Sequence, residues 1–387
     1  MDNPFRDAAA IVGVGSTEIT KRSGVSTLTL AVRAINDALA DAGLNRGDVD
    51  GVACHRVGDS ADPALVAQAI GVANLRFIQD FFGGGSSCIA PLSAAAIAVA
   101  SGQARCVVVW RALNGRSGPR MSGASAMTGL SSDAQYWMPY RHVSAPQQFA
   151  MFTRAYMHAY GVKAEDLGRV AIVQRDYAVL NPRAIMRRPI TMDDYLASRW
   201  IAEPLRLLDC CLETDAAVAL VVTSTARSRD LRRPPVTISA AASGGGNQLA
   251  SNHHRDLIAS GAAEMAPRLY KAAGLGPDDI DVAEFYDAFS PLVPVQLEAY
   301  GFCAAGEGAS MIAEGGTRTG GRLPVNTHGG HLSEGYVHGL NHVVEAVRQL
   351  RHECGARQVA GAEVALSTAQ PGINSGLTGA VLLKKAA

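Results

Sequence analysis

The sequence lacks an excess of charge of either sign, because 35 Lys and Arg residues balance 35 Asp and Glu residues among 387. It has no basic run, which argues against nucleic acid as the main partner. It has no apolar stretch of about 20 residues, so we expect no membrane span. Its seven cysteines include no CxxC pair for zinc. Residues 1–7 are polar and unlike a signal peptide, so we expect a reduced, cytoplasmic protein.

What is present is a chain able to bury a large core, since 48% of the residues are hydrophobic and only 18% are charged. Apolar runs and helical periodicity alternate along its first third. They predict strands over 8–15, 50–57 and 106–110, and helices over 27–42 and 93–101. This alternation indicates an α/β layered fold.

An internal repeat divides the chain. Ala42-Gly43-Leu44 and Asp48-Val49-Asp50 recur 231 positions later as Ala273-Gly274-Leu275 and Asp279-Ile280-Asp281. A supersecondary unit used twice implies two similar halves, which we place at 1–230 and 231–387. Within the first half, residues 112–200 form an excursion from the core. Its glycine-rich part, 112–150, is either a binding loop or a dimer contact.

Three segments carry residues suited to chemistry. In the first, Gly84, Gly85, Ser86 and Cys88 lie between a strand and a helix. Backbone N–H groups at such a turn can bind an anion or an oxyanion, and a cysteine there can become a thiolate. The alternative is that the small residues only allow close packing around a buried Cys88.

The second segment, 284–291, carries Tyr286, and the third, 326–339, carries Tyr336. The third segment also contains His328, His331 and His338 among four glycines. These histidines do not follow the HExxH pattern, and the glycines disfavour a regular helix. The pattern therefore favours a metal-free acid/base site over a metal site.

Residues 198–217 and 320–330 resemble the thiolase superfamily, in its lipid-transfer-protein and sterol carrier protein-like branch. The resemblance implies a five-layer α-β-α-β-α fold built from two similar halves, and a homodimer. The departures are informative. The thiolase Asn/His position holds Tyr286, the Gly-His-Pro position holds Tyr336, and the C-terminal loop 369–376 has no cysteine.

This tyrosine pair is similar to that of bacterial steroid side-chain-cleaving aldolases. The resemblance implies retro-aldol cleavage of a steroid β-hydroxyacyl-CoA to a ketosteroid and a short acyl-CoA such as propionyl-CoA. The coenzyme A thioester is then the substrate, with no cofactor and no metal. Family members use a companion subunit with an OB-fold and a zinc ribbon, and here such a partner would be a separate chain or absent.

We assign Tyr286, Tyr336 and His338 as catalytic. We assign the substrate-binding residues as follows: Gly84, Gly85, Ser86, Cys88, His328 and Gly329. The tyrosine pKa is ordinarily about 10, so a tyrosinate base near pH 7 would require neighbouring donors or positive charge to lower it. Arginines 111, 116 and 120, or 187 and 188, could form a patch for coenzyme A. Two alternatives remain: an acyl-CoA thiolase (acetyl-CoA acetyltransferase) using Cys88, and a non-catalytic lipid or acyl-CoA binding protein.

Overall fold

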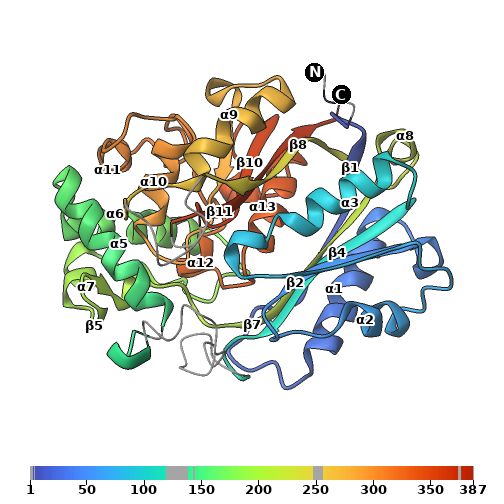
Figure 1. The fold of residues 1–387 in the computed structure, drawn as a ribbon, viewed down its shortest axis with the longest axis horizontal. Helices are drawn as coiled ribbons and strands as arrows, with labels where there is room; N and C mark the ends of the chain where they lie inside the picture. The colour runs from blue at the N-terminus through green and yellow to red at the C-terminus, as the bar shows by residue number, and fades with distance from the viewer. Residues whose placement is uncertain are drawn as a thin grey trace.

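A mixed nine-stranded sheet organises the molecule (Figure 1). The computed structural model describes residues 3, 5–118, 138–142, 144–246, 256–373 and 376–386. The strand order is β3-β2-β4-β7-β1-β8-β11-β10-β9. Strands from the first half of the chain therefore occupy one side of the sheet, and strands from the second half occupy the other.

The first half supplies five strands: β1 (Ala9–Ser16), β2 (Gly51–Arg56), β3 (Phe77–Phe82), β4 (Cys106–Asn114) and β7 (Asp215–Ser224). β2 runs parallel to β3 and β4, whereas β7 is antiparallel to β4 and β1. Nearly every residue of β4 and β7 is buried, because helices cover both faces of these strands. β3 lies at the edge of the sheet, and only Phe77 in it is buried.

The second half supplies four strands: β8 (Val236–Gly245), β9 (Val282–Glu284), β10 (Val364–Thr368) and β11 (Leu377–Lys385). The halves join where β1 pairs with β8, at only two positions, Ala10 with Thr237 and Ile11 with Val236. A junction this narrow lets the two parts of the sheet lie at different angles around the helices between them.

Helices divide the fold into layers. Ala10 and Val12 of β1 belong to the cluster formed with α1 (Thr27–Ala42) and α2 (Pro63–Ala69), whereas Ile11 faces the central core. The register shift between Ile11 and Gly13 reverses this alternation, so Val14 faces the central core and Gly13 lies against α1. α3 (Ala90–Ala100) and α13 (Leu340–Leu350) fill that core and contact strands of both halves. α9 (Gly261–Ala273) packs on β8 and β11. The order is α-β-α-β-α, as the sequence predicts.

The predicted repeat has a common backbone geometry. α1 ends at Gly43 with φ +73°, and η1 (Arg46–Asp48) then leads into β2. α9 ends at Gly274 with φ +69°, and η6 (Pro277–Asp279) then leads into β9. The left-handed backbone at each helix end favours glycine. The repeated unit is therefore confirmed, while the division at 230/231 stays a prediction.

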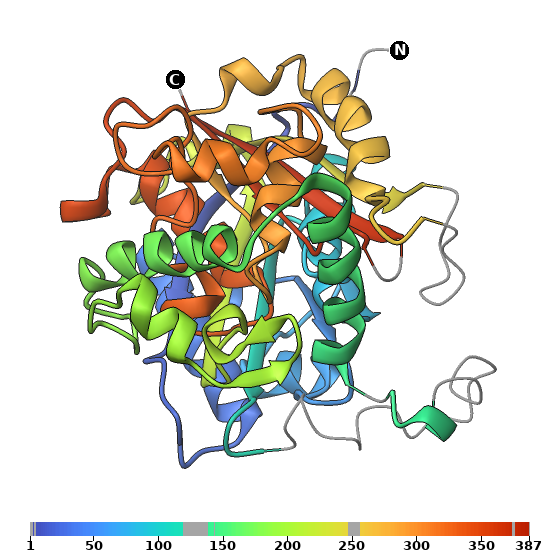
Figure 2. The ribbon, with the colours of Figure 1, turned by 90° about the vertical axis from the view of Figure 1, so that its left-hand side faces the viewer.

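The excursion over 112–200 is largely helical where it is described. β4 continues to Asn114, and η4 (Met138–Tyr140), α5 (Ala145–Tyr160), α6 (Ala164–Val179), α7 (Met192–Ala197) and β5 (Trp200–Ala202) follow. The green helices α5, α6 and α7 gather beside the second half (Figures 1 and 2). The proposed binding loop falls mostly on residues 119–137 and 143, which lie outside the described residues.

Shorter elements complete the fold: η2 (Gly85–Ser87), β6 (Leu205–Arg206), η5 (Leu207–Asp209), α8 (Thr225–Ser228), α10 (Leu292–Ala299), α11 (Gly308–Ala313), α12 (Gly330–Ser333) and η7 (Gly355–Arg357). α3 begins at Ala90 rather than at the predicted Ser93, because Pro91 is compatible with a first helical turn. None of the described helices is long and apolar enough to cross a membrane.

Candidate active site

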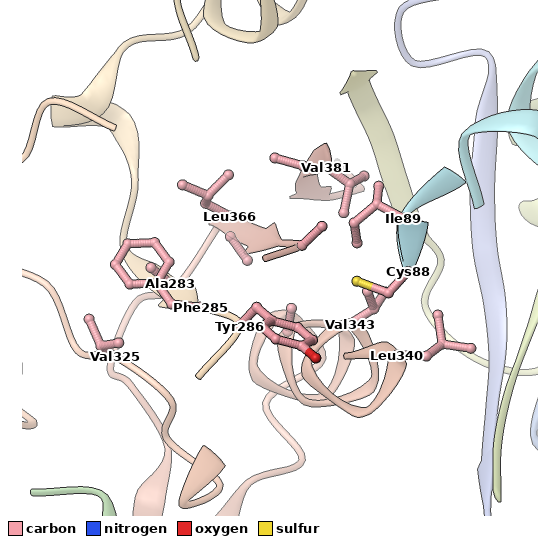
Figure 3. Close-up of a cluster of buried hydrophobic side chains, with 14 of the residues drawn as sticks. Cys88, Ile89, Ala283, Phe285, Tyr286, Val325, Leu340, Val343, Leu366 and Val381 are labelled. Carbon is pink, nitrogen blue, oxygen red and sulfur yellow. The ribbon is translucent and has the colours of Figure 1, made fainter. Parts of the chain in front are cut away.

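The structure brings the two predicted tyrosines into direct contact. Tyr286 follows β9, Tyr336 follows α12, and their hydroxyl oxygens lie 2.8 Å apart although 50 residues separate them. Both side chains are buried, at 3% and 5% exposure. Figure 3 shows Tyr286 within a cluster of buried apolar side chains that includes Leu340 and Val343 of α13.

Backbone contacts from distant segments hold the two tyrosines. The Tyr286 N–H donates to Thr368 Oγ1 of β10, and the Tyr286 carbonyl accepts from Gln296 Nε2 of α10. Thr214 Oγ1 donates to the Tyr336 carbonyl and accepts from its N–H. The His331 ring packs edge-on against both tyrosine rings, at 4.9 and 4.7 Å between centroids. Contacts from β10, α10 and α12 of the second half, and from Thr214 directly before β7, therefore hold the pair in position.

The glycine turn before α3 lies against the pair, as predicted. A Cβ at Gly85 would lie 2.2 Å from the Tyr286 hydroxyl oxygen, so this position accommodates only glycine. A Cβ at Gly84 would lie 3.4 Å from His338 Nε2. Ser86 belongs to the same short helical turn, η2, and is half-buried.

Burial raises the pKa of both tyrosines well above the ordinary value. The requirement for a tyrosinate base, a pKa lowered toward 7, is therefore not met. Removal of water around the two rings disfavours a phenolate, and this outweighs the Arg111 charge acting on Tyr336. Both hydroxyls are therefore protonated in the resting site.

Cys88 is also at the pair but is not an activated nucleophile. Its sulfur lies where a Cβ of Gly339 would approach it to 2.6 Å, and its S–H points to the Thr368 carbonyl at 4.0 Å. Burial raises the pKa of the Cys88 thiol well above its usual range. The thiolate reading is therefore not supported, and Cys88 behaves as a small buried side chain (Figure 3).

His338 lies beside Tyr336, with ring centroids 5.3 Å apart. Its Nδ1 is 2.9 Å from Nη2 of Arg111, a fully buried residue of β4. Burial and the Arg111 charge hold the pKa of His338 well below its ordinary value. His338 is therefore neutral and supplies no positive charge to the tyrosine pair.

Arg111 is equally unavailable to the predicted coenzyme A patch, because it is enclosed and paired with Asp59 at 2.5 Å. Of the other patch candidates, arginines 116, 187 and 188 are exposed, and Arg120 lies outside the described residues. Sequence reasoning missed the link between Arg111 and His338. The available signal was a lone arginine within the apolar run 106–113.

A buried chain of two carboxylates and three imidazoles lies behind the pair. Glu284 contacts His328 Nδ1 at 2.9 Å, and His328 Nε2 lies 3.0 Å from His342 Nδ1. His342 Nε2 contacts Asp287 at 3.1 Å, and Asp287 contacts His331 Nδ1 at 3.2 Å. We call these five residues the imidazole–carboxylate chain. His342 lies in the first turn of α13, and no sequence motif surrounds it. No signal in the sequence therefore indicated that it belongs to this group.

Two predicted substrate-binding residues belong to this chain or its surroundings rather than to the tyrosine hydroxyls. Against the opposing effect of burial, the carboxylates of Glu334 and Glu284 raise the pKa of His328 to about 9. Burial raises the pKa of Glu284 to about 7. A Cβ at Gly329 would lie 2.6 Å from Ala178 Cβ of α6, so this glycine serves helix packing.

The imidazole–carboxylate chain contains two overlapping groups of residues that could hold a metal ion. One is Glu284 with His328 and His342, and the other is Asp287 with His331 and His342. The donor atoms of each group lie within 4.8 Å of one another. The three histidines weighed for a metal site from the sequence, His328, His331 and His338, do not form one group, because His338 lies with Arg111. Of the four successive contacts, only that between His328 Nε2 and His342 Nδ1 is a hydrogen bond, and the three imidazole–carboxylate contacts of 2.9 to 3.2 Å lack hydrogen-bond geometry. The absence of a metal stays a prediction.

Comparison with known proteins identifies the family of the chain. Residues 244–384 match the family model "Thiolase C-terminal domain-like". The chain is 46% identical over 356 residues to a steroid side-chain-cleaving aldolase of Thermomonospora curvata, covering 89% of this chain and 90% of the relative. It is 45% identical over 384 residues to the 17-hydroxy-3-oxo-4-pregnene-20-carboxyl-CoA lyase of Mycobacterium tuberculosis, covering 95% and 98%.

The solved structures give the same result. A chain of an Ltp2-ChsH2(DUF35) aldolase superposes with a TM-score of 0.92 and 43% identity over 98% of both chains. An SCP2-thiolase-like protein of Mycobacterium smegmatis, 20% identical, superposes with a TM-score of 0.75 over 99% of this chain and 78% of that one, which shows the fold alone. The chain therefore belongs to the steroid side-chain-cleaving aldolases of the thiolase superfamily.

Proposed function

We propose that the protein cleaves the side chain of a 17-hydroxy steroid acyl-CoA by a retro-aldol reaction that yields a 17-ketosteroid and propionyl-CoA. The relatives' names support this substrate class. The observation that carries the proposal is the 2.8 Å contact between two buried tyrosine hydroxyls at positions where thiolases carry other catalytic groups.

The pair acts as a proton relay that needs no tyrosinate. The tertiary hydroxyl gives its proton to Tyr286 Oη, Tyr286 gives its own proton to Tyr336 Oη, and Tyr336 protonates the α-carbon. The electrons of the Cα–Cβ bond pass through the thioester enolate into the new C–H bond, while the C–O bond becomes the ketone. Both tyrosines end as they began, protonated, which agrees with their raised pKa values.

The reaction is redox-neutral and consumes no water, so its balance calls for no cofactor or metal. The residues of the site also distinguish this proposal from the two alternatives. A thiolase needs a thiolate and a histidine that activates it, whereas the Cys88 thiol is buried and has a raised pKa. A passive carrier has no use for two acid/base groups aligned in one pocket.

We further propose that the protein forms a homodimer and binds a separate companion chain with an OB-fold and a zinc ribbon. The edge strand β3 leaves backbone groups unpaired and exposes Ile78 and Phe82, the latter at 84%. Such an edge is usually covered by another chain, and a second copy can pair with it symmetrically. The DUF35 component named with the Ltp2-ChsH2 aldolase supports the companion.

The test is an assay of a 17-hydroxy steroid acyl-CoA with and without a co-expressed companion, with both products followed by mass spectrometry. Light scattering of the same samples gives the stoichiometry. Release of a ketosteroid and a free acyl-CoA in equal amounts supports the proposal. Acyl transfer to Cys88, or binding without turnover in both samples, overturns it. A fully active monomer contradicts the proposed assembly alone.

A further inference from the structure

The His338 ring lies between the glycine turn and a buried arginine. Its Nε2 is 3.4 Å from where a Cβ of Gly84 would stand, so the missing side chain leaves space next to this nitrogen. Its Nδ1 is 2.9 Å from Arg111 Nη2. The two ring nitrogens thus face different partners, one in the active site and one in the core.

Arg111 determines which nitrogen carries the proton. A guanidinium has five N–H donors, no acceptor, and keeps its charge in proteins. His338 Nδ1 must therefore present a lone pair, which leaves the only ring proton on Nε2. Arg111 is itself held in place, because Nη2 also donates to Asp59 at 2.5 Å and Nη1 donates to the Ala112 carbonyl at 3.1 Å.

The backbone of His338 is held as firmly as its ring. His338 has φ +57°, a left-handed conformation uncommon for a residue with a side chain. Its carbonyl lies 3.2 Å from Nε2 of His55 on β2. Such backbone strain tends to persist at functional sites, where the surroundings fix one orientation.

We propose that Arg111 is a positioning residue that locks His338 as a neutral Nε2–H donor, and that this donor binds the thioester oxygen as it becomes the enolate oxygen. The Tyr336 ring, 5.3 Å from the His338 ring, then lies beside the carbon to be protonated. Preorganised donors aimed at developing charge are usually the largest contribution to such catalysis. The inference rests on the proposed retro-aldol reaction.

The first test reads the tautomer without turnover. The whole protein, carrying its companion where one binds, is labelled with ¹⁵N-histidine, and His338→Gln identifies the His338 signals by their loss. The titratable or charged groups facing this ring are Arg111, Asp59, His55, His331 and Tyr336. We expect the Nε2–H tautomer from about pH 5.5 to about pH 9. An Nδ1–H tautomer, or titration near pH 6.5, overturns the inference.

The second test uses Arg111→Met, which removes the guanidinium donor and keeps an unbranched side chain in place of the aliphatic stem. His338 should then populate both tautomers or titrate, and kcat should fall at least 10-fold and acquire a pH dependence, with KM nearly unchanged. Arg105→Met is the matched control, because that arginine precedes the same strand and is 71% exposed. A wild-type kcat and pH profile in Arg111→Met contradicts the positioning role.

The third test separates the donor from the ring. His338→Phe should lose roughly 100- to 1000-fold in kcat, and His338→Gln, which restores an N–H donor that does not titrate, should recover at least 10-fold of that loss. Equal activity of the two variants overturns the donor role. If Arg111→Met fails to fold, Arg111→Lys and the wild-type spectrum are used instead to test the positioning role of Arg111. If no steroid thioester is cleaved, the proposed function fails while the tautomer result still stands.

Discussion

The tyrosine pair and the imidazole–carboxylate chain are two buried polar clusters in contact through His331, and they differ in charge. The pair holds two neutral hydroxyls joined by one hydrogen bond. The chain holds groups whose pKa values both rise, that of His328 to about 9 and that of Glu284 to about 7. Buried groups that stay neutral, as in the tyrosine pair, can pass protons to one another. Buried groups that carry paired charges, as in the imidazole–carboxylate chain, stabilise the structure around the site.

Removing either hydroxyl should give the largest effect. Tyr286→Phe and Tyr336→Phe each keep the ring and break the relay, so kcat should fall roughly 100- to 10,000-fold. Because the two hydroxyls act as one unit, the double variant should be no worse than either single variant within a few-fold. Steady-state kinetics with the steroid acyl-CoA measure all three.

A multiplicative loss in the double tyrosine variant would mean independent roles instead of a relay. Near-normal cleavage by both single variants would remove the tyrosine mechanism altogether. Thermal unfolding serves as the control, and each single variant should keep the wild-type midpoint within a few degrees.

Removing the charge of Glu345, which lies next to the imidazole–carboxylate chain, should affect the stability of the protein rather than its catalytic rate. Thr327 Oγ1 lies 2.9 Å from a carboxylate oxygen of both Glu345 and Glu284, and Glu345 pairs with Arg357 at 2.8 and 3.0 Å. Glu345→Gln leaves the buried Arg357 without its counter-charge, so the free energy of unfolding should fall by about 3–5 kcal/mol. Urea unfolding measures the loss, and kcat per folded molecule should stay within a few-fold. A large drop in kcat with intact stability would contradict this division.

The two clusters should also respond differently to pH. The His328 pKa is raised in the folded state, so the stability it contributes is fully present below about pH 6.5 and is lost as pH rises toward about 9. We expect the thermal midpoint to fall across this range while kcat stays flat, because neither tyrosine titrates there. A kcat that rises with an apparent pKa near 7 would indicate a tyrosinate base.

Cys88→Ala should have the smallest effect among the substitutions. The thiol is buried and protonated, so kcat should stay within a few-fold of wild type, with a stability loss on the order of 1 kcal/mol for the lost packing. Mass spectrometry of the substrate-treated protein provides the check. An acyl group on Cys88, or a loss on the order of 1000-fold, would restore the thiolase alternative.

Chelation should have no effect, because the proposed reaction draws on no ion. Dialysis against EDTA should leave kcat unchanged, and metal analysis of the isolated chain should find less than one equivalent. Zinc carried by a companion subunit is the necessary control, so the chain is analysed both alone and in complex. A metal whose removal abolishes activity would identify the imidazole–carboxylate chain as a metal centre.

Local patterns in the sequence determined the elements, the repeat and the identity of the tyrosine pair. Helical spacing and Gly43 predict α1 and its end, because a left-handed backbone at a helix terminus favours glycine wherever the helix lies. Tyr286 and Tyr336 could be singled out because they occupy motif positions that are read along the chain. The helices of the excursion were missed because their glycine-rich entrance obscured the helical signals that begin at Ser144.

Only the tertiary structure decided the protonation states. The sequence shows only that a tyrosinate base would need a lowered pKa, whereas burial raises the tyrosine pKa values. Burial and Arg111, 227 residues away, lower the pKa of His338. His342 likewise joins its chain through contacts between α13, α12 and the end of β9. A pKa depends on the water, charges and donors within a few ångströms of a group, and folding brings these from positions that no local pattern connects.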